Sequence, residues 1–566
     1  IRRQRQMCIR DSYGIEYEEF ASQIATVALW LIDHQMNMSL SAEFGEYYKR
    51  LPLKKSATIV HGNALRIDWQ SLLNPLNSIE VEAEHANIYI VNEPEPEFKE
   101  INIKAKTYHV HEGPKPAAKS KVNFDYILGN PPFIGYAWQS EEQKKDMNLV
   151  FNAIQGAGVL DYVAAWYLKA AQLIRETKSK VAFVSTNSIT QGEQVAILWS
   201  ELIKNGTKIF FAHRTFKWNN EAKGNAAVHV VIVGFANSDI PGKRIFSYHD
   251  IKGEPLEIKV KNINPYLVNA PDVFIQKRNI PISKVPRISR GSDAIDDGNF
   301  LLNQEERDLL IAKYPQVKRY IKPFLMGKEF LNNIPRYCIW LKDADLSEIR
   351  KLPLIYERIE NVKQFREKSK RTQTIKAAKF PYLFGEERQP ESDYLAIPKV
   401  SSENREYIPI GFCKKDIICG DKLFNLPKAT LYHFGILTSA MHMTWMRYVC
   451  GRLKSDYSYS NTIVYNNFPW PQDLPKQKIA GVEKLSQQVL KVRERYPESS
   501  LADLYDPLTM PADLVRTHQD LDKFVDSCYR PQAFETEMQR IEFLFDLYKV
   551  YTQPLFGAEK RKRSKK

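Results

Sequence analysis

The chain has 566 residues, and 81 Lys and Arg residues against 67 Asp and Glu residues give it a formal net charge of +14 at pH 7. This length corresponds to roughly three or four domains, and the basic balance favours a polyanionic partner. No apolar run is long enough for a transmembrane helix and no signal-peptide pattern opens the chain. The composition therefore excludes an integral membrane protein and predicts a soluble, cytoplasmic protein.

The first 65 residues predict two short strands separated by a helix. Residues 1–12 are basic, lack a clear periodicity and are interpreted as a non-native scar. Tyr13–Glu16 then predicts a strand end, and Glu18–Met36 predicts a helix with one apolar face. That face contains Phe20, Ile24, Val27, Ala28 and Leu31. Ile59–Leu65 predicts a second strand that runs into a turn, and residues 70–121 have the mixed Pro, Glu and Lys composition of an insertion.

Glu16 is the first candidate binding residue. An acidic residue directly after a strand in a nucleotide-binding sheet commonly accepts hydrogen bonds from ribose hydroxyls. An acidic residue in the first turn of a helix is also favourable without any ligand. The residue pattern alone leaves both interpretations open.

The clearest indication of a chemical function comes from a predicted strand and the rigid turn that follows it. The apolar run Phe124–Leu128 predicts a short buried strand that ends in Gly129. In the turn Asn130-Pro131-Pro132-Phe133, two successive prolines stiffen the backbone and remove two N–H donors. The Asn130 side chain and the Pro131 carbonyl can then accept both hydrogens of an amino group on a planar ring, while Phe133 stacks on that ring. This arrangement favours methyl transfer to the nitrogen by positioning, although an ordinary Pro-rich turn is the alternative.

The segments after this turn predict the rest of an α/β sheet. Gln139–Asn148 is polar and is interpreted as a mobile loop, and Asp161 is interpreted as the N-cap of a helix that extends to about Glu176. Val181–Ser185 predicts a buried strand, and Ile209–Ala212 and Val228–Phe235 predict the last strands. Between the last two lies the aromatic segment Phe216–Asn220, which packing alone could also explain.

The second half of the chain has a different character. Residues 281–298 are polar and rich in Gly and Asp, which indicates a domain junction. The next segment mixes short strands with basic and aromatic side chains, among them Arg358, Lys363, Arg366, Lys368, Lys370, Arg371, Lys376, Lys379, Tyr382 and Phe384. From residue 472 onward the apolar spacing is helical, with Val482, Leu485, Val489, Ile541, Leu544 and Leu547 as the apolar positions.

Six motifs together resemble the MmeI-like restriction–modification enzymes, which are prokaryotic DNA methyltransferases specific for adenine N6. The motifs are Tyr13–Glu16, His61–Leu65, Gly129–Phe133, Tyr457–Asn461, Phe468–Pro471 and Leu504–Pro507. The resemblance implies a Rossmann-like class I AdoMet-dependent methyltransferase sheet, followed by a mixed α/β target-recognition domain and a helical C-terminal region. The implied boundaries are 13–285, 290–471 and 472–556, with a basic tail at 557–566.

The resemblance also assigns site residues. Asn130, Pro131, Pro132 and Phe133 would be catalytic, and Phe133, Phe216 and Trp218 would stack on the flipped target base. The cofactor S-adenosyl-L-methionine would contact Ile15, Glu16, Asn63, Ala64, Asn130 and Asp161. The partner would be double-stranded DNA, the protein would be a monomer, and neither a membrane nor a metal would take part.

The chain differs from the family pattern at its start. Family members have a glycine-rich AdoMet loop and a nuclease domain upstream of the position of Tyr13, and both are expected to be missing here. Two alternatives therefore stay open. The chain could be a catalytically inactive DNA-binding or specificity fragment, or a protein-glutamine methyltransferase that uses a similar Asn-Pro-Pro turn on a planar amide.

Overall fold

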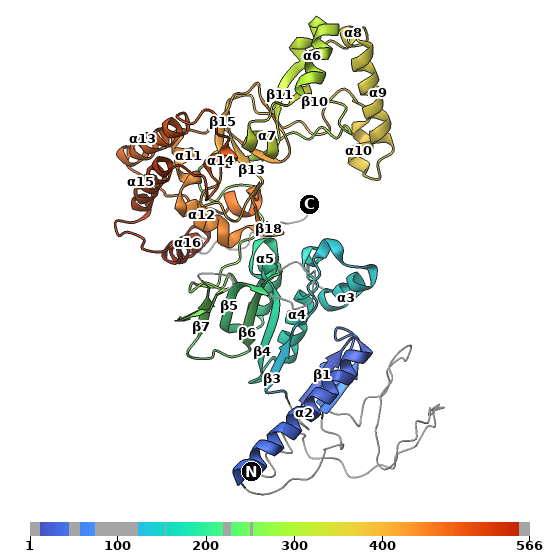
Figure 1. Cartoon of the computed structure of the whole chain (residues 1–566), viewed down its shortest axis with the longest axis vertical. Coiled ribbons are helices and arrows are strands. Elements are labelled where there is room, and N and C mark those ends of the chain that lie inside the picture. Colours follow the sequence, from blue (N-terminus) through green and yellow to red (C-terminus); the bar gives the residue numbers. More distant parts are fainter. Residues whose placement is uncertain are drawn as a thin grey trace, which may run out of the picture. The chain divides into compact units, whose positions relative to one another are not determined.

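The computed structural model describes residues 12–44, 57–73, 123–152, 154–218, 228–248 and 253–553. The chain divides into two compact units, whose elements are labelled in Figure 1. The first unit comprises Ile1–Val184, Leu202–Lys208 and Gly234–Ile240, and the second comprises Ser185–Glu201, Ile209–Val233 and Pro241–Lys566. The predicted scar, insertion and basic tail lie outside the described residues, apart from Ser12 and the short helix η1 (Trp69–Leu73).

The first unit begins with a parallel pair of strands. Strands β1 (Ser12–Glu16) and β2 (Ala57–His61) pair with Glu16 opposite His61. Helix α2 (Glu19–Phe44) confirms the predicted helix and extends beyond its predicted end. Its apolar face is not buried, since Phe20 is 73% exposed and Leu31 is 55% exposed. An apolar stripe therefore predicted the helix correctly, although the residues that the structure describes leave this stripe uncovered.

Strand β3 (Tyr126–Gly129) corrects the expectation of a buried strand at Phe124–Leu128. Its side chains alternate between exposed and half-buried, and Leu128 is 76% exposed. The reason is the position of the strand, because β3 is at the end of the strand order and pairs in parallel with β4 (Lys180–Thr186). A central strand would be covered on both sides by neighbours, but an edge strand has only one.

The sheet that contains β3 has six strands in the order β3-β4-β6-β5-β7-β8. The predicted strand at Val181–Ser185 is confirmed, with every second residue of β4 buried. Strands β5 (Lys208–Trp218) and β6 (Val228–Ala236) confirm the next two predictions but are not the last, because β7 (Arg244–Ser247) and β8 (Leu256–Lys259) follow. Strand β7 pairs in parallel with β5 and antiparallel with β8, so the sheet is mixed.

Three helices follow the strands of this α/β region. Helix α3 (Glu141–Phe151) replaces the mobile loop predicted at Gln139–Asn148. Ser140 and Gln143 form a capping box at its start, which is a signal that the sequence already contained. Helices α4 (Ala164–Leu173) and α5 (Gly192–Lys204) follow β3 and β4 in the chain.

The region after the junction is built from three small sheets and short helices. The sheet orders are β10-β12-β11-β16, β15-β13-β17-β9 and β14-β19-β18. The strands are β9 (Ser289–Arg290), β10 (Leu301–Leu302), β11 (Ile321–Leu325), β12 (Tyr337–Ile339), β13 (Tyr394–Pro398), β14 (Val400–Ser401), β15 (Gly411–Cys413), β16 (Ile418–Cys419), β17 (Leu423–Pro427), β18 (Gly451–Leu453) and β19 (Asp456–Ser458). The helices are α6 (Gln304–Lys313), α7 (Gly327–Asn332), α8 (Leu346–Ile349), α9 (Pro353–Glu367) and α10 (Thr372–Ala377).

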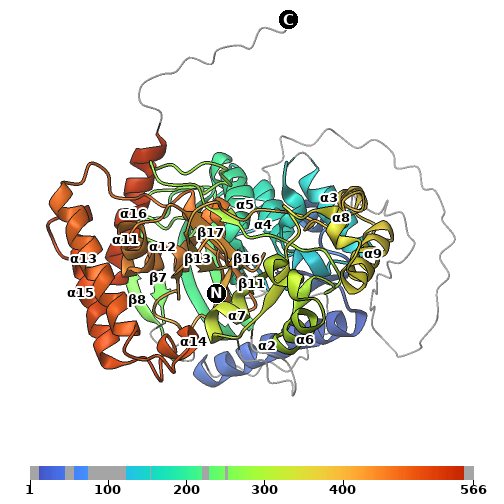
Figure 2. The same ribbon diagram turned by 90° about the horizontal axis from the view of Figure 1, so that it is seen from above.

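The C-terminal region is helical, as the apolar spacing predicted. It comprises α13 (Lys476–Arg493), α14 (Leu501–Leu504), α15 (Ala512–Tyr529) and α16 (Glu537–Thr552), which follow α11 (Leu431–Thr438) and α12 (Ala440–Val449). Helices α13 and α15 lie side by side in both views (Figures 1 and 2). They approach closely at Gly481, where an added Cβ would come within 2.1 Å of the Phe524 ring. The fold class is therefore confirmed as α/β with a mixed central region and a helical C-terminus.

The described residues contain neither a membrane-spanning helix nor a cluster of metal ligands. No helix among them is long and apolar enough to cross a membrane. No group of three or more His, Cys, Asp or Glu side chains in the same residues has the arrangement of a metal site.

Candidate functional site

The Asn130–Phe133 turn directly follows the carboxyl end of β3. An added Cβ at Gly129 would lie 3.1 Å from the Phe183 ring, so the glycine lets this strand end lie close to β4. Pro131 is buried, Phe133 is half-buried, and Asn130 is exposed. The Asn130 side chain forms no hydrogen bond with any residue that the structure describes. Its carbonyl oxygen is therefore available to accept a hydrogen bond from a ligand.

The segment before α4 fastens the chain that follows this turn. The backbone N–H of Tyr162 donates to the Ile134 carbonyl at 2.9 Å, and the backbone N–H of Tyr136 donates to Asp161 Oδ1 at 3.1 Å. Asp161 is therefore not the predicted N-cap, because α4 begins only at Ala164 and Val163 precedes it without a side-chain cap. Asp161 instead holds the backbone beside the catalytic candidate turn.

The predicted cofactor residues lie at adjacent strand ends, since Glu16 is the last residue of β1 and Asn63 follows β2. Because β1 and β2 are parallel, the residues after both strands lie at the same edge of the pair, which is where ligands bind in α/β sheets. Glu16 Oε1 accepts the backbone N–H groups of Tyr17 and Glu18 at 2.9 and 3.2 Å. Ile15 is half-buried in β1, and the Glu16 carbonyl accepts the backbone N–H of Gly62.

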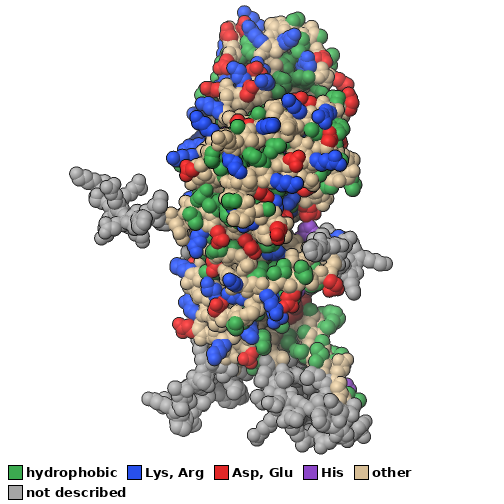
Figure 3. Space-filling view, turned by 90° about the vertical axis from the view of Figure 1, so that its left-hand side faces the viewer, with side chains coloured by type: hydrophobic (Ala, Val, Ile, Leu, Met, Phe, Trp, Pro, Cys, Tyr) green, Lys and Arg blue, Asp and Glu red, His purple; other side chains and the backbone are tan. Residues whose placement is uncertain are grey.

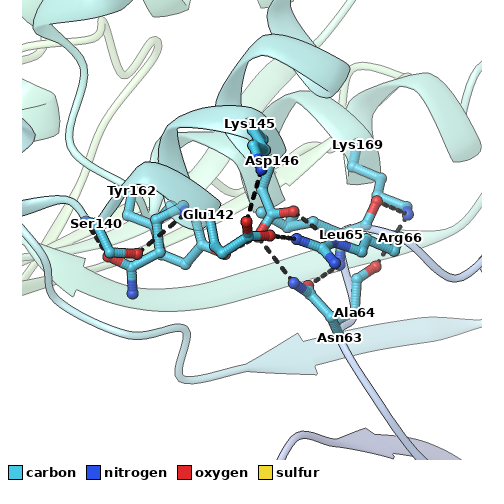
Figure 4. Close-up of polar contacts among 11 residues, drawn as sticks. Asn63, Ala64, Leu65, Arg66, Ser140, Glu142, Lys145, Asp146, Tyr162 and Lys169 are labelled. Carbon is cyan, nitrogen blue, oxygen red and sulfur yellow. Dashed lines mark hydrogen bonds and ion pairs between the residues drawn. The ribbon is translucent and has the colours of Figure 1, made fainter. Parts of the chain in front are cut away.

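Both polar side-chain atoms of Asn63 have partners within the protein (Figure 4). Its Oδ1 accepts the backbone N–H of Leu65 at 2.9 Å, and its Nδ2 donates to Asp146 Oδ2 at 2.8 Å. Asn63 is thus better placed to shape its turn than to offer a free amide to a ligand.

Asp146 from α3 is the centre of this polar cluster and was not predicted from the sequence. It is nearly fully buried and also accepts hydrogen bonds from Arg66 Nε at 2.7 Å and from the Tyr162 hydroxyl at 2.7 Å. Burial and then the hydrogen bond to Asp146 raise the pKa of Tyr162, and the Asp146 carboxylate raises the pKa of Arg66. No motif marks Asp146, because only the fold brings α3 to the turn after β2.

Lys169 from α4 holds the same turn from another direction. Its Nζ donates to the carbonyls of Ala64, Leu65 and Ile67 at 2.9, 2.9 and 2.5 Å. Burial lowers its pKa to about 8. The backbone of the predicted cofactor residue Ala64 is therefore held in place. The Gly62–Ile67 turn is bonded to both α3 and α4.

The predicted stacking residues Phe216 and Trp218 belong to the second unit. Both lie at the end of β5, and residues 219–227 as well as the Trp218 side chain lie outside the described ones. The Phe216 ring stacks on Tyr248 with the ring centroids 5.1 Å apart. Phe216 therefore already has an aromatic neighbour within its own unit.

Two members of the basic and aromatic group after residue 357 are not available to a ligand. Arg366 is completely buried and binds five backbone carbonyls, and Phe384 belongs to a buried core. Lys368, Lys370, Arg371, Lys376 and Lys379 are exposed. On the face drawn in Figure 3, Lys and Arg side chains are interspersed with Asp and Glu side chains.

These features define a class. They are polar residues at the carboxyl ends of parallel strands, an Asn-Pro-Pro-Phe turn whose amide has no hydrogen-bond partner among the described residues, and a separate region of small sheets. Together they characterise an α/β fold of the methyltransferase type with an added region of small sheets. Family profiles agree with this description. Residues 1–247 match the MmeI DNA-methyltransferase domain, residues 269–472 match the MmeI target recognition domain, and residues 474–556 match the MmeI C-terminal domain.

Individual relatives agree as well. The chain is 38% identical over 542 residues to DNA methyltransferase A of Bacillus subtilis (strain 168), which covers 96% of this chain and 56% of the relative. It is 46% identical to the type IIL restriction–modification enzyme MmeI, whose structure was solved in complex with DNA. That match has a TM-score of 0.77 and covers 95% of this chain and 66% of MmeI. The chain belongs to the MmeI family, as the sequence motifs predicted, and it spans between about half and two thirds of the length of these relatives.

Proposed function

We propose that this chain is the part of an MmeI-type restriction–modification enzyme that transfers a methyl group from AdoMet to the N6 amino group of adenine in double-stranded DNA. The observation that carries the proposal is the exposed Asn130 side chain, which has no hydrogen-bond partner among the described residues and stands next to buried Pro131 and half-buried Phe133. The family profile over residues 1–247 and the relative solved with DNA support it.

The target base would be held by three groups of the turn. The Asn130 side-chain carbonyl and the Pro131 carbonyl would each accept one N6 hydrogen, which directs the nitrogen lone pair toward the methyl donor. Phe133 would stack on the adenine ring. Because the N6 amino group of a paired adenine is inside the duplex, the base must be extruded, which costs a few kcal/mol that stacking and hydrogen bonds offset.

The residues present fit AdoMet in part. AdoMet supplies an activated methyl group when bound. Glu16 Oε1 is occupied by two backbone N–H groups, and its Oε2 could accept hydrogen bonds from ribose hydroxyls. Ile15 and Ala64 would border the adenine of the cofactor, and Asn63 would act by shaping the turn. Asp161 would act by holding the backbone after Phe133, since it accepts the Tyr136 N–H.

The test is formation of N6-methyladenine in duplex DNA, measured by mass spectrometry after incubation with AdoMet. Asn130→Ala removes an acceptor that acts on the reacting nitrogen, and it should lower kcat by about 10²–10³-fold with little change in DNA affinity. Gln519→Ala removes an exposed side-chain amide from α15 and is the control. Retained DNA binding without any methyladenine in the wild type would instead favour the inactive DNA-binding alternative.

A second measurement tests the cofactor contact separately. Glu16→Gln weakens hydrogen bonds that a carboxylate accepts, which are worth about 1.5–3 kcal/mol each. We expect AdoMet affinity, measured by calorimetry, to fall about tenfold or more. Equal affinity of the wild type and Glu16→Gln would remove Glu16 from the cofactor site.

A further inference from the structure

The second unit contains a pocket of about 500 Å³, which is partly lined by the Tyr457–Asn461 motif. It lies where β9 and β17 meet the segment that follows β19, within the part of the chain that matches the target recognition domain. Its polar lining residues include Arg290, Arg388, Lys399, Ser458, Ser460 and Asn461. None of the described residues that line it is acidic.

The three cations of the lining differ in their partners. Arg388 pairs with Glu386 at 2.7 Å. Arg290 Nη2 donates to Asp293 and Asp421 at 2.8 Å each, and its Nε is buried without a hydrogen bond. Lys399 forms no ion pair or side-chain hydrogen bond with a described residue. Arg388 and Arg290 therefore have carboxylates in direct contact, whereas Lys399 has only the more distant charges of Asp421 and Asp293 near it.

The surroundings of Lys399 make an anion the best occupant. The side chain is half-buried, and burial together with the nearby Arg290 lowers its pKa. An anion next to the ammonium would remove this penalty, because a partly buried charge is stabilised by an opposite charge. The two carboxylates hold the Arg290 guanidinium in one orientation, so its remaining N–H groups are fixed donors.

Neutral donors line the same pocket. The Ser458 hydroxyl and the Asn461 side-chain amide form no hydrogen bond with a described residue. The Ser460 hydroxyl contacts Thr462 Oγ1 at 3.0 Å and accepts the Ile463 N–H. A lysine, an arginine, a hydroxyl and an amide form the donor set that proteins commonly use for DNA phosphates.

We propose that this pocket binds a phosphodiester group of the DNA backbone, with Lys399 as the neutralising cation and Arg290 as a fixed second donor. The inference rests on the proposed function, because DNA is the substrate there. A contact of this kind positions the recognition region on the duplex and carries no base specificity of its own. The net charge of +14 is consistent with a DNA surface.

The experiment measures the affinity of the full chain for fluorescent duplex DNA at several KCl concentrations. Lys399→Gln should reduce the slope of log affinity against log salt by about 1, since one phosphate contact is lost. Affinity should fall by a similar factor for duplexes of different sequence. Lys399→Arg should restore the slope, and Lys491→Gln, at an exposed position of α13, is the matched control. Thermal melting of each variant checks that the fold is intact.

Four outcomes would overturn the assignment. If Lys399→Gln leaves the slope unchanged while the wild type forms methyladenine, the pocket is not a phosphate site and the proposed function is unaffected. A loss of affinity confined to some sequences would indicate base reading instead. Binding of inorganic phosphate that depends on Lys399, without an effect on DNA, would make the pocket a site for small anions. A wild type that neither binds nor methylates DNA would contradict the proposed function as well.

Discussion

The turn after β3 has an exposed polar side chain, whereas the interior of the second unit contains charged side chains that are buried and hydrogen-bonded. In the first unit, Asn130 is exposed after an edge strand, Asp161 accepts the Tyr136 N–H just beyond the turn, and Asp146 and Lys169 hold the separate Gly62–Ile67 turn. In the second unit, Arg366 and Asp522 are buried, and their hydrogen-bonding atoms have protein partners. The comparison teaches that order around the candidate site comes from a few polar contacts beside an open turn. At Arg366 and Asp522 of the second unit, local order depends instead on hydrogen bonds to buried charged groups.

The largest loss of stability is expected when Arg366 is replaced. Its guanidinium donates to the carbonyls of Ala294, Ile295, Ala377, Phe380 and Leu383, and burial lowers its pKa. Arg366→Met leaves these buried carbonyls without donors and should lower the free energy of unfolding by about 3–5 kcal/mol. Urea unfolding and hydrogen exchange of α9 and α10 measure it. Arg371→Met, at an exposed arginine, should cost no more than about 0.5 kcal/mol. Equal effects of the two variants would mean that water replaces the guanidinium.

Asp522 is a second buried charged group, and its effect on stability should depend on pH. Burial raises its pKa to about 7, although the Tyr407 hydroxyl and the Ala440 N–H donate to it and Arg540 lies nearby. Because the folded state then binds the proton more tightly than the unfolded state, this group reduces stability as pH rises from about 4 to 7, by up to about 4 kcal/mol.

The measurement is the free energy of unfolding of wild type and Asp522→Asn between pH 4 and pH 8. The variant should lose this pH dependence and should gain stability relative to wild type as pH rises. Asp520→Asn, at an exposed position of the same helix, should follow the wild-type curve. A parallel pair of curves for wild type and Asp522→Asn would show that the Asp522 carboxylate stays ionised across this range.

A smaller effect is expected at Asp146, where the polar contacts of the first unit meet. Asp146→Ala removes the acceptor of Asn63, Arg66 and Tyr162 and should cost about 2–3 kcal/mol. The loss should be local, with faster hydrogen exchange in residues 62–67. Glu141→Ala breaks the exposed pair with Lys144 and should leave both stability and exchange almost unchanged. Unchanged exchange in Asp146→Ala would mean that Lys169 alone holds the turn.

The same contrast explains what the sequence could predict. Short motifs with their own local geometry predicted local structure correctly, since Tyr13–Glu16 lies in strand β1 and the Asn130–Phe133 turn follows β3. The helical C-terminus followed from its apolar spacing. Asp146 and Lys169 could not be found, because they matter only through contacts 83 and 105 residues away along the chain. Helix α3 could have been predicted from its Ser140–Gln143 capping box, and the polar composition of the segment obscured that signal.

The smallest effect is expected at Leu128, where an apolar run suggested burial and the structure shows exposure. Composition cannot distinguish an edge strand from a central one, because the difference lies in the neighbours that the fold supplies. Leu128→Thr should change the free energy of unfolding by no more than about 0.5 kcal/mol, since little apolar surface is removed from the interior. Val181→Ala, at the buried position of β4 that pairs with Ile127, should cost about 1–3 kcal/mol. Urea unfolding followed by tryptophan fluorescence compares the two. If Leu128→Thr costs as much as Val181→Ala, another surface covers β3 in solution, and the open edge beside Asn130 is closed in the working protein.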